Sequence, residues 1–200
     1  IRDRSVSRGL GDVYKRQQKE HPYVAVIPVL TQLQEWLQAI SVSWFHEEDE
    51  TSHTIVNAIE EYCRTLTDRL ISDRKLNQDM KVQIEKCIEK IQVLVEDKAD
   101  LLTDKIIKAE VYGLSNELFA CCLRQQGLRA QTLDTGKFMQ INLERKPDIP
   151  YIKESVQQYI SEKRDADIFI APLSLCKNVY GETAVSYTHL RAHETLSDIV

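Results

Sequence analysis

The sequence predicts an α/β fold with a mainly parallel sheet and a long helical insertion. Two short runs, residues 22–30 and 167–171, are almost continuously apolar and rich in Val and Ile, which is typical of strands buried on both faces of a parallel sheet. Between these runs, apolar residues recur every three or four positions over long stretches, which indicates helices. With 42% hydrophobic and 28% charged residues among 200, the chain has the composition of a globular domain with a sizeable core.

The first predicted strand leads into a helix. Thr31 is expected to cap this helix, because apolar residues follow it at helical spacing: Leu33, Trp36, Leu37 and Ile40. The next segment, residues 46–50, contains four consecutive acidic residues and is therefore predicted to be an exposed loop.

Two long amphipathic helices are predicted next, as an antiparallel hairpin. The first covers residues 51–71, and the second begins after a polar break at residues 72–77 and continues to Val95, with no Gly or Pro inside either segment. A shorter helix is expected to start at Leu101 and to stop at a break near Tyr112-Gly113. Another helix would then run through Leu123.

The last third of the sequence alternates between strand and helix patterns. Gly127 is placed to end a helix, and residues 128–133 have the alternation of a strand. Residues 137–143 could add extended structure, residues 149–163 are expected to be helical, and the apolar run 167–171 closes the pattern.

Several kinds of chemistry lack a sequence signal. The four glycines of residues 18–183 form no glycine-rich phosphate loop, and no Ser lies in a nucleophile-elbow motif. The five cysteines include no Cys-x-x-Cys pair, so neither a zinc site nor a disulfide framework is supported, and the vicinal Cys121-Cys122 pair is expected to pack in a core. No apolar run approaches the roughly 20 residues of a membrane span. Metal, membrane and nucleic-acid binding are therefore not expected.

The two ends of the chain resemble translated DNA from a sequencing library. Residues 7–17 and 185–195 match translations of a transposon-type sequencing adapter and of its reverse complement. We therefore expect residues 1–17 and 184–200 to be non-native and residues 18–183 to form one partial domain. Without the ends the net charge changes from −5 to −7, because six basic and four acidic residues are removed. That acidity gives no electrostatic reason to expect nucleic acid as a partner.

Three stretches of the native part carry a resemblance to a known family. Residues 111–117 read Val-Tyr-Gly-Leu-Ser-Asn-Glu, residues 123–134 read Leu-Arg-Gln-Gln-Gly-Leu-Arg-Ala-Gln-Thr-Leu-Asp, and residues 143–148 read Leu-Glu-Arg-Lys-Pro-Asp. In this order they resemble the Tyr-Gly-Glu helix start, the Leu-Arg strand and the Phe-Gly-Arg-Ala-x-Pro-Asp loop of aspartate kinases, which belong to the amino-acid kinase superfamily. The similar order of segments extends over nearly all of residues 18–183.

This resemblance implies a fold and a reaction. The fold would be part of the three-layer sandwich of amino-acid kinases, which is also called carbamate-kinase-like. The reaction would be the ATP-dependent phosphorylation of the β-carboxylate of L-aspartate, with Mg²⁺, at the start of lysine, threonine and methionine biosynthesis. A cytoplasmic enzyme would follow, and the full-length protein could form a homo-oligomer.

The resemblance also implies two substrate-binding residues. Arg145 matches the loop arginine that would hold a substrate carboxylate as a planar two-pronged donor. Leu114 stands where the family has a substrate-binding Glu, and Glu117 takes that role if the alignment shifts slightly. No catalytic, cofactor-binding or metal-binding residue is assigned, because the Lys-Phe-Gly-Gly and Gly-Arg-Gly-Gly-Ser-Asp motifs of the family would lie outside residues 18–183.

Two alternatives remain open at this stage. The domain could be a catalytically silent kinase-like module for regulation or oligomerisation, because Leu114 and the Pro172-Leu173-Ser174 turn depart from the family pattern. Residues 51–99 could also serve as a helical interaction module.

Overall fold

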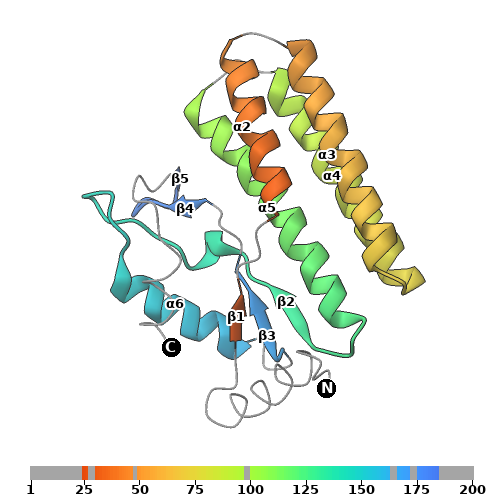
Figure 1. Ribbon diagram of the computed structural model, residues 1–200. Helices are drawn as coiled ribbons and strands as arrows, with labels where there is room; N and C mark the ends of the chain where they lie inside the picture. Colours follow the sequence, from red (N-terminus) through yellow and green to blue (C-terminus); the bar gives the residue numbers. More distant parts are fainter. Residues whose placement is uncertain are drawn as a thin grey trace, which may run out of the picture.

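A computed structural model describes residues 24–26, 30–46, 49–96, 100–162, 166–171 and 175–184. Its elements follow the chain in this order: β1 (Val24–Val26), α2 (Thr31–Phe45), α3 (Asp49–Leu70), α4 (Arg74–Glu96), α5 (Leu101–Arg124), β2 (Ala130–Thr132), the 3-10 helix η1 (Thr135–Lys137), α6 (Ile149–Glu162), β3 (Ile168–Ile170), β4 (Cys176–Lys177) and β5 (Thr183–Ala184). Helices α2 to α5 form an upright bundle, and the small parallel sheet and α6 lie at its lower end (Figure 1).

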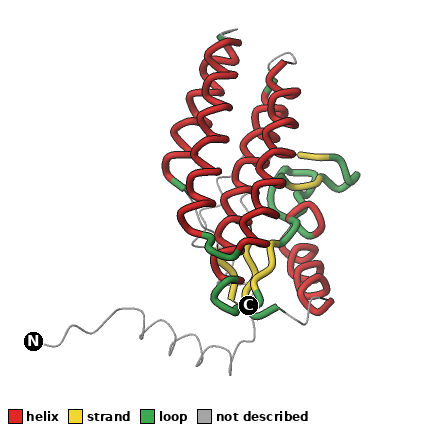
Figure 2. Tube along the Cα trace, turned by 90° about the vertical axis from the view of Figure 1, so that its right-hand side faces the viewer, coloured by secondary structure: helices red, strands yellow, loops and turns green. Residues whose placement is uncertain are grey.

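The bundle is built around the predicted helical hairpin. Helices α3 and α4 lie side by side with α2 and α5 against them, as both views show (Figures 1 and 2). Each helix buries one apolar stripe in a shared core, which includes Leu37, Ile59, Ile84, Ile91 and Val111. The periodicity that predicted the hairpin is therefore the periodicity of burial.

The turn between α3 and α4 is held by polar side chains. Asp73 caps α4 by accepting a hydrogen bond from the backbone N–H of Leu76, at 2.9 Å. The amide of Asn77 donates to the backbone carbonyls of Thr67 and Ile71, each at 3.2 Å. Because these bonds satisfy the helix ends, α4 starts at Arg74, inside the segment that sequence analysis treated as a break.

Two predicted helix boundaries are wrong. Leu30 occupies the N-cap position of α2 and makes no side-chain cap bond, so Thr31 is the first helical residue rather than the cap. A single helix, α5, replaces the two helices expected around Tyr112-Gly113. One glycine costs a helix only about 1 kcal/mol, and burial of the turns on both sides of Gly113 outweighs that cost.

The C-terminal end of α5 is formed as predicted. Gly127 has a φ of +82°, the left-handed conformation that favours glycine just beyond a helix. Its N–H donates to the carbonyl of Arg124, and the N–H of Leu128 donates to the carbonyl of Leu123. The chain thereby turns directly into β2.

Three short parallel strands form the main sheet, in the order β1-β3-β2. Residues Val24 and Ala130 both pair with Ile168, on opposite sides of the central strand β3. The parallel sheet was predicted, although each strand is only three residues long. The region 137–143 is mostly not extended: η1 ends at Lys137, and isolated bridges at Gln140 and Ile141 are its only described strand-like pairings.

Helices α5 and α6 pack against opposite faces of this sheet. Ile168 and Ile170 of the central strand cluster with Ala120 of α5. Phe169, which points to the other face, clusters with Ile152 and Val156 of α6. The alternation explains why this strand is apolar at every position.

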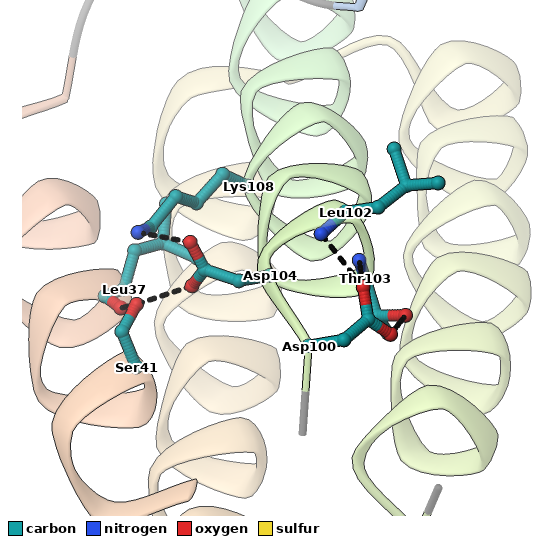
Figure 3. A network of polar contacts seen from close by, with 7 residues as sticks. All are labelled: Leu37, Ser41, Asp100, Leu102, Thr103, Asp104 and Lys108. Carbon is teal, nitrogen blue, oxygen red and sulfur yellow. Dashed lines mark hydrogen bonds and ion pairs between the residues drawn. The ribbon is translucent and has the colours of Figure 1, made fainter. Parts of the chain in front are cut away.

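A buried charged network joins α2 to α5 (Figure 3). Asp104 is 5% exposed, and its carboxylate accepts hydrogen bonds from the hydroxyl of Ser41 and, at 2.8 Å, from the ammonium of Lys108. Just before it, Asp100 caps α5 through the backbone N–H groups of Leu102 and Thr103. The start of α5 is therefore fixed both to its own first turn and to α2.

Replacing Asp104 by Ala should lower the free energy of unfolding by about 2 to 4 kcal/mol, because Lys108 would keep a half-buried charge without its partner. Urea denaturation followed by circular dichroism measures this change. The matched control is Lys146→Ala, which removes a fully exposed ion pair with Glu144 and should cost less than about 0.5 kcal/mol. Equal effects of the two substitutions would contradict the structural role of Asp104.

A second ion pair joins the first residues of the sheet. Arg129 lies before β2 and Asp167 before β3, and the guanidinium donates to both carboxylate oxygens, at 2.9 Å and 2.5 Å. Hydrogen bonds from the side chain of Arg129 lower the pKa of Asp167, although partial burial opposes the shift. The pair closes the amino-terminal edge of the sheet.

Asp167→Asn should lower the free energy of unfolding by about 0.5 to 1 kcal/mol at pH 7. Because the pKa of Asp167 is lowered in the folded state, its stabilisation is present above the unfolded pKa of about 4 and is lost as the pH falls below it. Urea midpoints of the two proteins should therefore differ at pH 6, and the difference should shrink as the pH falls below about 4. A difference that stays constant over this range would exclude the charge as its cause.

Candidate functional site

A large depression lies at the carboxyl end of β2. It has a volume of about 780 Å³, and its walls come from α4, α5, the segment 132–136 and strand β4. The carboxyl edge of a parallel sheet is where α/β proteins usually bind their ligands. The residues that line it with polar or charged side chains are Gln83, Lys86, Lys90, Glu110, Asn116, Glu117, Thr132, Asp134, Thr135, Tyr159, Lys177 and Thr183.

Glu117, one of the two predicted substrate-binding residues, lies on this wall and is held by two neighbours. The guanidinium of Arg124 donates to one carboxylate oxygen at 2.5 Å, and the hydroxyl of Thr132 donates to the other at 2.9 Å. Arg124 also donates to the carbonyl of Ala130 at 2.8 Å. Burial is the largest single influence on the pKa of Arg124 and lowers it, but the hydrogen bond to Glu117, the charge of Glu117 and the contact with Cys121 together raise this pKa above its ordinary value.

Lysine side chains stand at the rim of the cavity. Lys90 pairs with Glu110, whereas neither Lys86 nor Lys177 forms an ion pair with any residue that the structure describes. Asp134 faces the same space and accepts a hydrogen bond from the backbone N–H of Gly136 at 3.0 Å. The cavity therefore presents cationic and anionic groups together, which suits a zwitterionic ligand better than a purely anionic one.

Asn116 contributes a buried polar group without a partner. The residue is 1% exposed, its Nδ2 donates to the carbonyl of Tyr112 at 2.8 Å, and its Oδ1 has no hydrogen-bond partner. Buried acceptors are rarely left in this state, because the lost hydration costs about 1 to 3 kcal/mol. Sequence analysis did not single out Asn116, since no motif marks it.

The cysteines near the cavity are not suited to nucleophilic chemistry. Burial raises the pKa of the Cys87 thiol to about 12, and burial also raises the pKa of Cys121. Cys121 is buried in the bundle core, as predicted, and Cys122 is only half-buried. The thiols of Cys87 and Cys121 therefore stay protonated at neutral pH.

Arg145, the other predicted substrate-binding residue, lies in a different place. It is exposed and lines a second depression of about 410 Å³, together with Leu143, Tyr180 and Thr183. Its φ of +60° is the left-handed conformation of a tight turn, in which the side chain of Asn142 accepts two backbone N–H groups. The two depressions share only Thr183 among their lining residues, so the structure does not bring Glu117 and Arg145 into one cavity.

The predicted acidic loop is shorter than expected. Glu47 and Glu48 lie outside the described part of the chain, and Asp49 and Glu50 already belong to α3. Within the described ranges, no cluster of three or more metal-ligating side chains occurs. None of the helices in that part of the chain combines the length and apolar character that a bilayer crossing requires.

The arrangement of elements is an aspartate-kinase-like α/β fold. Escherichia coli aspartokinase III in complex with aspartate and ADP (R-state) matches with a TM-score of 0.64 and 18% identity, over 88% of this chain and 40% of that chain. The same enzyme with lysine and aspartate (T-state) matches with a TM-score of 0.63 and 18% identity, over 87% and 40%. Clostridium acetobutylicum aspartate kinase matches with a TM-score of 0.56 and 10% identity, over 91% and 39%.

These identities show similarity of fold alone. The chain spans about 40% of the length of the aspartokinase structures that it matches. No family model and no curated protein sequence matches the chain.

Gly113 keeps one part of the cavity wall free of a side chain. A Cβ atom built at this position would meet nothing within 4 Å, and the backbone there is ordinary α-helix. Gly113→Ala should therefore raise the free energy of unfolding by about 0.5 to 1 kcal/mol, measured by urea denaturation.

The control for this substitution is Gly127→Ala. A Cβ there also meets nothing, but its φ of +82° strains any other residue, so the free energy of unfolding should fall by about 1 kcal/mol. Destabilisation by both substitutions would mean that Gly113 is closely packed, against the structure.

Proposed function

We propose that this chain contributes the aspartate-binding part of an aspartate-kinase-like enzyme. The single observation that supports this most strongly is the match in fold to aspartokinase III in complex with aspartate and ADP, combined with a large cavity at the carboxyl edge of the parallel sheet. In the complete protein the reaction would be the ATP-dependent phosphorylation of the β-carboxylate of L-aspartate.

The chemistry of the cavity supports an amino-acid ligand. L-Aspartate carries two carboxylates and one ammonium group. Lys86 and Lys177 are available for the carboxylates, and Asp134 offers an acceptor for the ammonium. The lining contains three lysines and three carboxylates, so its formal charges cancel. These residues are Lys86, Lys90, Lys177, Glu110, Glu117 and Asp134.

The described residues do not form a site for ATP or Mg²⁺. A phosphate cradle needs clustered backbone N–H groups at a glycine-rich turn, but the four described glycines lie in four separate segments. We therefore derive no phosphoryl-transfer step from this chain, and the use of ATP and Mg²⁺ is proposed for the complete protein by analogy with the ADP complex.

The proposal also covers the domain boundaries, the sandwich fold, the cellular location and the oligomeric state. Residues 18–183 would form part of a three-layer amino-acid-kinase sandwich, with residues 1–17 and 184–200 derived from adapter DNA. A cytoplasmic location and a homo-oligomeric full-length protein would follow from the resemblance to aspartate kinases.

A second candidate function is a kinase-like domain that has lost its catalysis and serves regulation or oligomerisation. Two observations favour it. Leu114, at the family's Glu position, is buried in the bundle core, and both oxygens of Glu117 already accept hydrogen bonds from Arg124 and Thr132. Glu117 therefore has less capacity left for a substrate than the resemblance implies.

Isothermal titration of the 200-residue chain with L-aspartate tests the proposed binding function. Aspartate should bind, and Lys86→Met with Lys177→Met should weaken binding by about tenfold or more, because the cations that face the carboxylates are removed. Lys146→Ala, which removes an exposed lysine that does not line the cavity, is the control and should bind as the parent does.

The same titrations separate the candidate functions. Unchanged binding in Arg145→Ala would remove Arg145 from the substrate site, and weakened binding would keep it there. Absence of aspartate binding in the parent chain would contradict the proposed function. Micromolar binding of ATP·Mg by the complete protein would exclude the silent domain.

A further inference from the structure

The second depression, of about 410 Å³, collects large apolar side chains that the fold leaves exposed. Five of its eleven lining residues are large hydrophobic residues that are at least 40% exposed, and among the described residues none of this kind lines the candidate cavity. Such side chains are ordinary on a surface when they are scattered singly, but a cluster of them marks an interaction site. The five residues are Leu101, Leu102, Leu143, Val179 and Tyr180.

Two turns of the same construction hold part of this apolar surface in place. They are residues 142–146 and 178–182, and each begins with an asparagine. The side-chain oxygen of the asparagine accepts the backbone N–H groups of the residues two and four places later, at 2.9 to 3.0 Å. Its backbone carbonyl accepts the N–H of the residue three places later, at 2.9 Å. Each turn is therefore ordered by its own hydrogen bonds.

One of these turns keeps its shape although its sequence does not favour it. The fourth residue of each turn is left-handed: Gly181 has a φ of +81° and Arg145 a φ of +60°. Glycine adopts this conformation freely, whereas the Cβ of arginine makes it unfavourable. Strain of this kind is retained where the resulting shape serves a function. Here the two turns present Leu143 and Tyr180, each 77% exposed, at the second depression.

The chemistry of the lining indicates what covers it. The lining contains no carboxylate, and Arg145 is its single charged residue, so an apolar segment is the occupant that loses least on leaving water. Because the turns are already ordered, covering their side chains costs little conformational entropy.

The size of the second depression indicates where that segment comes from. Eleven residues line it, whereas a stable dimer uses roughly 20 to 30 residues from each partner. A contact this small is sufficient when the occupant is tethered, because tethering raises its effective concentration. Tethered chain exists in the matched aspartokinases, of whose length this chain spans 40%.

We propose that the second depression seats an apolar segment of the same polypeptide, from the part of the aspartate-kinase-like enzyme that lies outside this chain. The inference rests on the proposed function, which makes this chain one part of a longer enzyme. Lys177 of the candidate cavity directly precedes the 178–182 turn, and Thr183 lines both depressions. A segment seated on this turn therefore also fixes the β4–β5 pair, which forms part of the cavity wall.

The test measures how fast a thiol-specific maleimide labels cysteines placed in the second depression. Leu143→Cys and Tyr180→Cys are each made in the 200-residue chain and in the complete protein, which contains the further polypeptide. Both positions should label rapidly in the 200-residue chain. In the complete protein they should label at least about tenfold more slowly, because the seated segment must open before the reagent enters.

Val93→Cys is the matched control. Val93 is 62% exposed on α4 and lines neither depression, so its labelling rate should be the same in both proteins. The parent chain gives the background from the native thiols, of which four are buried and Cys122 is half-buried. Thermal melting followed by circular dichroism shows that each variant is folded.

The remaining outcomes overturn the inference. Equal rates in the two proteins at the two depression positions would show that the further polypeptide does not cover them. Equal slowing at all three positions would mean general protection in the larger protein rather than a seat at the second depression. Labelling of the 200-residue chain that slows as its concentration rises would assign the second depression to a second copy of the chain.

The labelling rates are independent of aspartate, so this inference and the proposed function are judged separately. If the complete protein protects the two positions but binds no aspartate, the proposed substrate is wrong and the internal interface stands. If it binds aspartate but leaves both positions open to the reagent, the interface is wrong and the proposed function stands.

Discussion

The structure depends on one helix, α5, being buried on two sides. Ile107, Val111 and Leu118 face the bundle core, whereas Ala120 packs on the sheet. A charged side chain that this burial encloses needs a partner inside the protein. Asp104 finds Ser41 and Lys108, and Glu117 finds Arg124 and Thr132.

The site is a direct result of this constraint. Where α5 passes the carboxyl edge of the sheet, the helix is no longer covered by a strand, and its polar residues face a cavity instead. Glu117 is retained there by Arg124, which also binds the carbonyl of Ala130 and so fixes the last turn of α5 to β2. Arg124 thus joins Glu117, on the cavity wall, to the strand beside it.

Local patterns predicted those elements whose identity is decided by burial on one face. The α3–α4 hairpin follows from a period of 3.6, the strand around Ala130 from the alternation in residues 128–133, and the strand around Ile168 from the apolar run 167–171. The continuity of α5 through Gly113 could not be predicted, because it is decided by packing against segments that are distant in sequence. The prediction that Thr31 caps α2 is wrong for a different reason. Thr31 has a side chain that can cap a helix, but it is the first helical residue, and no side-chain cap bond is made.

The site was predictable only as far as the family resemblance extends. Glu117 does line the main cavity, but Arg145 lies in a separate depression, because the turn at Asn142 closes on itself. Lys86 and Lys177 come from elements that are about 90 residues apart in the chain, and they line the same cavity only after the chain has folded. Sequence spacing contains no signal for such a pair.

The order of the three strands has a consequence for how the chain folds. β1 and β3 are neighbours in the sheet, yet Val24 and its partner Ile168 are separated by more than 140 residues of chain. The helical hairpin needs only local contacts, whereas closing this loop costs entropy that no contact repays until α5 and α6 are in place. We therefore expect the sheet, and with it the cavity, to form late in folding, after the whole chain from β1 to β3 has been synthesised.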